Sequence, residues 1–195
     1  MSLDAHWIDI KPGDVGFDGG VGISGWLIRH ATGIHGHTWV YHEFLRKDSN
    51  GNDVWRTVEA GPKDGVIFRE RTRRPNKVVR LWETPIEQQR ILDASANCVG
   101  AKYGWGEIAR IVWHLLGIRY EGTKDNPNRM ICSNHVATAV AAANKATRYT
   151  LPYKPNQIWP QRLAQWADWY LWTKSRNREN KPTRYYDSGY KDGYL

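Results

Sequence analysis

Strand-like segments fill the first half of the chain, and helix-like segments fill most of the second half. Short runs rich in Val, Trp and Tyr, some of them alternating with polar residues, predict strands at residues 15–17, 38–45, 54–60, 65–69 and 78–82. Longer runs of good helix formers predict helices at residues 84–102, 106–116, 132–144 and 160–172. This order favours an α+β fold, in which an antiparallel sheet packs against helices, over an alternating βαβ fold.

Two local signals strengthen these assignments. Residues 48–53 (DSNGND) are all of types that favour tight turns, so they predict a hairpin between the second and third strands. Thr84, Pro85 and Glu87 have the spacing of a capping box with proline at the first helical position, which predicts that a helix begins there.

The chain length suits one domain. With 195 residues, 11 Trp and 10 Tyr, it can bury a substantial core. We expect a single domain over residues 1–173 and a basic, Tyr-rich tail over residues 174–195, and we expect a monomer.

Charge and cysteine content narrow the function classes. The 28 Lys and Arg exceed the 20 Asp and Glu, and the net charge of +8 favours polyanionic partners such as nucleic acid, anionic lipid or an anionic cell-wall polymer. No apolar run is long enough for a membrane span, and no export leader is visible, which predicts a protein that is cytoplasmic as synthesised. Only two cysteines are present, so we expect free thiols rather than a disulfide scaffold.

Cys132 is the candidate nucleophile, because it opens an alanine-rich helix after a polar loop. Backbone N–H groups and the helix dipole stabilise a thiolate at that place. Cys132 can equally be a small buried apolar residue. Cys98 fits that second reading well, because it lies on the apolar face of its predicted helix, seven residues after Ile91.

A cysteine nucleophile needs a base, and the base needs a group that orients it. His37 begins the long second strand, and Glu59 ends the strand paired with it, so that the carboxylate can accept an imidazole N–H. His35 and His42 are alternative bases, whereas His135 lies on the same helix as Cys132 and cannot easily reach across a cleft. The histidines lack a standard metal-ligand spacing, and we expect neither a metal nor a cofactor.

Five segments together resemble the circularly permuted, NlpC-type papain-like cysteine hydrolases (the YiiX/LRAT-like group). In chain order they are residues 11–17 (KPGDVGF), 24–40 (ending in GIHGHTWV), 57–66 (TVEAGPKDGV), 131–136 (ICSNHV) and 153–163 (YKPNQIWPQRL). They are similar to the family's glycine–aspartate opening, histidine loop, acidic segment, nucleophile segment and late proline motif.

The resemblance implies a permuted papain-like fold with Cys132 as nucleophile, His37 as base and Glu59 as orienting residue. It implies a cysteine amidase or peptidase, a thiol protease in the broad sense, and the basic charge suits peptides of the bacterial cell wall (peptidoglycan). Without a leader, action on a cell wall requires a non-standard route, which a bacteriophage origin supplies.

Two other functions stay open. An acyltransferase or lipid hydrolase uses the same three residues. A non-catalytic module for nucleic acid or another polyanion is also consistent with two basic runs, although no recognised nucleic-acid motif accompanies them. The runs are Arg69, Arg71, Arg73, Arg74, Lys77 and Arg80, and Lys174, Arg176, Arg178, Lys181 and Arg184 with Tyr185 and Tyr186.

Overall fold

A computed structural model describes residues 9–19, 35–72, 75–115, 128–144, 158 and 160–178. The main sheet contains β1 (Val15–Asp18), β2 (His37–Lys47), β3 (Asp53–Gly61), β4 (Gly65–Arg71) and β5 (Lys77–Val79). The helices are α2 (Pro85–Ala96), α3 (Trp105–Leu115), α4 (Cys132–Asn144) and α5 (Pro160–Arg178), and a short parallel pair joins β6 (Lys102–Tyr103) to β7 (Arg129–Met130). The predicted α+β class is therefore confirmed.

The main sheet is antiparallel throughout, with the strand order β4-β3-β2-β1-β5. The predicted β2–β3 hairpin is present, and its turn is held by the Asp48 carboxylate, which accepts bonds from the backbone N–H groups of Asn50 and Asn52. Gly51 has a φ of 78°, which an L-residue with a side chain rarely adopts. Two register shifts in β2, after Tyr41 and after Phe44, interrupt the pairing with β3.

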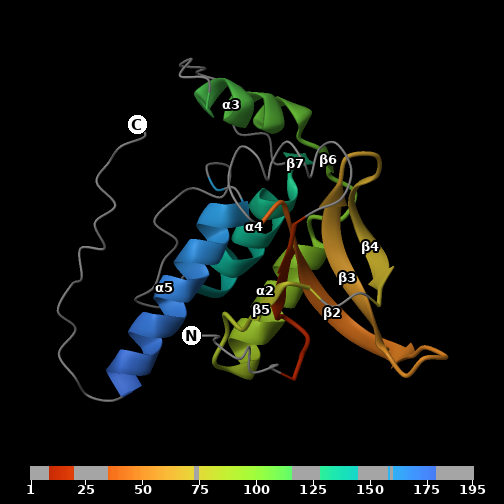
Figure 1. The fold of residues 1–195 in the computed structure, drawn as a ribbon, viewed down its shortest axis with the longest axis vertical. Coiled ribbons are helices and arrows are strands. Elements are labelled where there is room, and N and C mark those ends of the chain that lie inside the picture. The colour runs from red at the N-terminus through yellow and green to blue at the C-terminus, as the bar shows by residue number, and fades with distance from the viewer. Residues whose placement is uncertain are drawn as a thin grey trace.

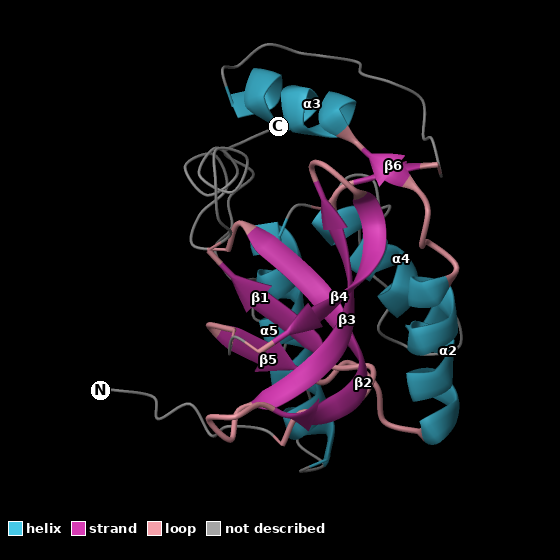
Figure 2. Ribbon diagram, turned by 90° about the vertical axis from the view of Figure 1, so that its right-hand side faces the viewer, coloured by secondary structure: helices cyan, strands magenta, loops and turns pink. Residues whose placement is uncertain are grey.

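Helices α4 and α5 cover one side of this sheet, as Figures 1 and 2 show. The predicted alternation of β2 is confirmed, because Val40 joins the main core with Val136 and Val140 of α4. Trp39 and Tyr41 point the other way and pack with Trp55 in a separate cluster. Helix α4 packs against β2 and β3 of the sheet and also against α2, so it connects α2 to the sheet.

Helix α2 begins where the sequence predicts it, with Thr84 as N-cap and a complete capping box to Glu87. It ends at Ala96, however, so the prediction of a helix through residue 102 is wrong. The reason is a tertiary contact: the N–H of Val66 donates to Ala101 O, and the N–H of Gly100 donates to Val66 O. These bonds attach residues 100 and 101 to the start of β4, so they cannot continue the helix.

Helix α5 continues to Arg178 rather than ending near residue 172, so the first residues of the predicted tail are helical. The rest of that tail, residues 179–195, lies outside the described residues. Within the described parts of the chain, no helix is long and apolar enough to cross a membrane.

Candidate functional site

The three residues predicted to act together come from three different elements. His37 is the first residue of β2, Glu59 lies near the end of β3, and Cys132 is the first residue of α4. The fold brings them together: the His37 ring interacts by hydrogen bonding with both the Glu59 carboxylate and the Cys132 side chain. The site is therefore assembled where the N-terminus of α4 meets the first strand of the β2–β3 hairpin.

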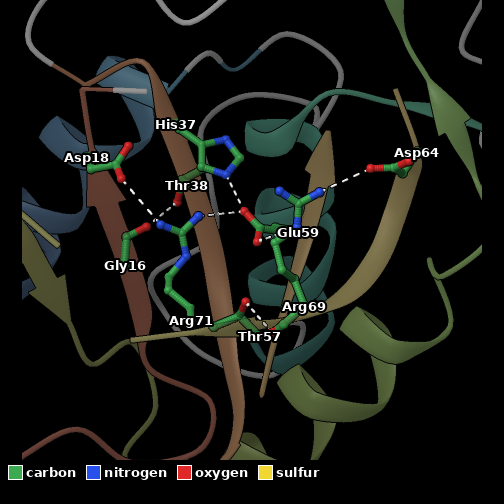
Figure 3. Close-up of polar contacts among 9 residues, drawn as sticks. All are labelled: Gly16, Asp18, His37, Thr38, Thr57, Glu59, Asp64, Arg69 and Arg71. Atoms are coloured by element: carbon green, nitrogen blue, oxygen red, sulfur yellow. Dashed lines mark hydrogen bonds and ion pairs between the residues drawn. The ribbon is translucent and has the colours of Figure 1, made fainter. Parts of the chain in front are cut away.

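The contact between His37 and Glu59 is short and shielded (Figure 3). His37 Nε2 lies 2.6 Å from Glu59 Oε2, the Glu59 side chain is buried, and the His37 side chain is 19% exposed. This bond occupies Nε2 and leaves Nδ1 as the ring nitrogen available to the Cys132 sulfur. A carboxylate on one nitrogen fixes the orientation and tautomer of the ring, as a base beside a thiol requires.

Opposite charges determine the protonation of this pair. Burial alone lowers the pKa of His37, but hydrogen bonds and charge interactions with Cys132 and Glu59 outweigh it and raise the pKa to about 9. Burial likewise raises the pKa of Glu59, yet the hydrogen bond and charge of His37, together with Arg71, lower it to about 2. At neutral pH His37 is therefore an imidazolium and Glu59 a carboxylate.

Cys132 lies at the start of α4 and is 1% exposed. It packs in a small apolar cluster with Val58 and Ala60 of β3 and with Tyr103 and Ile131. No acidic residue lies in the first turn of α4, so no carboxylate of that turn opposes the helix dipole, which favours an anion at the helix start.

Cys98 has a different environment. It lies in the turn that follows α2, its Sγ donates to Ala94 O at 3.2 Å, and burial raises the pKa of its thiol. The raised pKa and the local backbone bond are those of a structural cysteine.

Two arginines of β4 contact Glu59, and sequence reasoning assigned them only to a basic run. Arg71 Nη2 donates to Glu59 Oε2 at 2.7 Å, and Arg69 Nε lies 3.3 Å from Oε1 (Figure 3). Since Glu59 pairs with Ile67, period two places residues 67, 69 and 71 on the same side of the sheet as Glu59. The register of the β3–β4 hairpin was thus the signal that locates these arginines.

The other candidate histidines occupy separate places. The backbone N–H of His35 donates to Gln161 Oε1, and its ring packs on Phe17. The ring of His42 packs edge-on against Phe68, and His135 is buried beside Ser95. Among the described histidines, His37 is the one that interacts with Cys132. His30 lies outside the described residues.

Asp14, in the glycine–aspartate opening, holds the start of β1 in place. Its buried carboxylate accepts the backbone N–H of Lys11 and two bonds from Arg80, at 2.9 and 2.8 Å. Its contacts are therefore with Lys11 and Arg80 and not with the Cys132–His37–Glu59 group. In the described residues, no three His, Cys, Asp or Glu side chains are grouped so as to hold a metal ion.

No known protein-family model matches this chain, and no curated protein matches it in sequence.

Proposed function

We propose that the protein is a cysteine hydrolase of the permuted papain-like class, with Cys132 as nucleophile, His37 as base and Glu59 as orienting residue. One observation carries the proposal: a single imidazole, His37, interacts with both the thiol that opens a helix and a buried carboxylate on the neighbouring strand. This is the arrangement that activates a thiol for attack on a carbonyl carbon.

The residues supply each proton transfer that acyl transfer requires. The Cys132 thiolate attacks the carbonyl carbon, and the backbone N–H of Cys132 at the start of α4 donates to the oxyanion; losing such a donor typically costs about 3 kcal/mol. The His37 imidazolium gives its proton to the leaving amine, and a thioester on Cys132 remains. Neutral His37 then takes a proton from water, whose oxygen attacks the thioester, and the thiolate is released as His37 becomes an imidazolium again.

Within this class we propose an amidase or peptidase that acts on peptides of the bacterial cell wall. The support is the resemblance of the five sequence segments together with the net charge of +8, which favours an anionic polymer as the substrate's surroundings. A lipid hydrolase or an acyltransferase uses the same three residues, and in the acyltransferase a lipid or amine acceptor replaces water.

The ion pairs of the sheet give less support to a polyanion-binding module. Described members of the first basic run are paired with acids: Arg69 with Asp64, Arg71 with Glu59 and Asp18, Lys77 with Asp168, and Arg80 with Asp14. An arginine whose positive charge is already balanced by a carboxylate contributes less to the binding of a phosphate. Arg73 and Arg74 lie outside the described residues.

The proposed function is tested by the alkylation rate of Cys132 as a function of pH. Iodoacetamide labelling is quantified by peptide mass spectrometry in the wild type and in His37→Ala, and Cys98 serves as the control thiol in the same molecule. We expect Cys132 to react well below pH 8, faster than Cys98, and to lose its low-pH reactivity in His37→Ala.

An ordinary thiol titration of Cys132, unaffected by His37→Ala, contradicts the proposal. If the activated thiol is found, cell-wall peptides and acyl esters are offered as substrates, with Cys132→Ala as the inactive control. New free amines identify amide hydrolysis, and transfer of the acyl group to an added amine identifies an acyltransferase.

A further inference from the structure

A largely buried arginine contacts the Cys132–His37–Glu59 group. When the thiol is ionised, Cys132, His37 and Glu59 together carry one excess negative charge in a largely buried place. An uncompensated buried charge is strongly unfavourable. Of the two arginines that contact Glu59, Arg71 is the more buried: its side chain is 15% exposed, and its Nη2 donates to Glu59 Oε2 at 2.7 Å.

Arg71 and His37 share one oxygen atom of Glu59. His37 Nε2 lies 2.6 Å and Arg71 Nη2 lies 2.7 Å from the same Oε2. With a fixed cation on that oxygen, Glu59 is a weaker proton acceptor, so the shared proton stays on His37. His37 then keeps the positive charge that favours a thiolate at Cys132.

Arg71 is fixed from two further sides. Its Cζ lies 3.8 Å from the centre of the Trp39 ring, and its Nη1 lies 3.5 Å from Asp18 Oδ2. The Trp39 ring in turn lies against the backbone of Gly16, so closely that a Cβ at Gly16 would be 2.4 Å from Trp39 Cε2. Stacking and a two-sided ion pair hold a planar guanidinium in one orientation, as a lysine ammonium cannot be held.

We propose that Arg71 is a positioning residue of the catalytic site, which keeps Glu59 ionised and His37 protonated so that Cys132 is a thiolate in the resting enzyme. This inference depends on the proposed function, because it assigns a role within the same site. The ionisable groups around Arg71 and Glu59 come from four strands and one helix: Asp18 (β1), His37 and Tyr41 (β2), Glu59 (β3), Arg69 (β4), and Cys132 and His135 (α4).

Arg69 is the matched control within the chain. It is two residues away on the same strand and the same side of the sheet, and its Nε lies 3.3 Å from Glu59 Oε1. Unlike Arg71, it is 45% exposed and also pairs with Asp64. Water screens such a charge, so its removal is expected to change the site less.

The experiment compares the alkylation of Cys132 by iodoacetamide against pH in the wild type, Arg71→Met and Arg69→Met. We call the pH below which Cys132 is no longer alkylated the acidic edge of its reactivity. In Arg71→Met we expect this edge to move up by about one pH unit or more, because a cation near the ionised group is lost. In Arg69→Met we expect a smaller upward movement. Far-UV circular dichroism and urea midpoints establish that each variant is folded.

If Arg71→Met does not fold, Arg71→Lys and Arg69→Lys replace the two variants. Each keeps its charge, but neither lysine can bind two carboxylates as the arginine does. At residue 71 this loss falls in a largely buried place, so the edge is expected to move in Arg71→Lys. At the exposed residue 69 water screens the change, so the edge is expected to stay in Arg69→Lys. Equal movement in the matched variants overturns the role of Arg71 alone. Absence of low-pH reactivity in the wild type overturns the proposed function itself.

Discussion

Ser95 Oγ and His135 Nε2 lie 2.8 Å apart where α2 packs against α4. Both side chains are fully buried, and this contact joins the helix that carries Cys132 to its neighbour. Burial lowers the pKa of His135 to about 4, and the charge of His37 acts in the same direction. His135 is therefore neutral at physiological pH and adds no charge beside the candidate site.

The neutral state of His135 predicts a loss of stability in mild acid. Between pH 6.5 and about 4 the unfolded chain binds a proton here that the folded protein does not, so the free energy of unfolding falls as the pH falls. The total loss is on the order of 3 kcal/mol. Urea unfolding at pH 7, 6 and 5 measures it. His135→Gln should show a shallower pH dependence, and an identical slope in the two proteins would contradict the prediction.

Glu59→Gln is expected to lower the pKa of His37 from about 9. Glutamine keeps a hydrogen-bonding oxygen but removes the charge that favours the imidazolium, while burial still disfavours it. NMR titration of labelled histidine measures the shift, and the turnover rate is expected to fall by about 10²-fold. Glu43→Gln is the control, because Glu43 is an exposed carboxylate beside His42 and Arg56. An equal effect of both variants on His37 would refute the assignment.

Gly16→Ala is expected to destabilise the fold and to disturb the site. The new methyl group needs the space that the Trp39 ring occupies, and Trp39 supports Arg71. The overpacking costs about 1–3 kcal/mol in the free energy of unfolding. Gly61→Ala is the matched control in β3, since the nearest neighbour of its new methyl group would be Arg69 Nη2 at 3.5 Å, an ordinary contact. Urea unfolding compares the two, and similar losses would count against a steric cause at Gly16.

Arg80→Met is expected to cost about 3 kcal/mol or more of stability. It removes two hydrogen bonds from the Asp14 carboxylate and leaves that group buried without its cation. Lys47→Met removes one partner of an exposed ion pair, with Asp53, and should have little effect. Thermal and urea unfolding of both variants measure the difference, and the prediction fails if Arg80→Met is no worse than Lys47→Met.

Local patterns predicted the elements that carry the site. The alternation around Trp39 and Val40 and the capping signals at Thr84 act within a few residues, so sequence alone reveals them. The family resemblance implied that Cys132 lies near His37, and the interaction between their side chains agrees with it.

Features that depend on distant parts of the chain were missed. The end of α2 is fixed by bonds from β4 to residues 100 and 101, and no local signal marks these bonds. The role of Arg71 also depends on pairing, because only the β3–β4 register shows that this basic residue faces Glu59 rather than a solvated edge.

Strand β4 forms one edge of the main sheet among the described strands. Its first residues are covered by bonds to residues 100 and 101, but residues 67–71 have β3 as their strand neighbour on one side. Arg69, Glu70 and Arg71 place three successive charges on this edge, and a charged edge resists the addition of a strand from another molecule. Arg69, the exposed arginine that contacts Glu59, therefore also opposes aggregation at this edge, and its replacement by an apolar residue should lower solubility at high concentration.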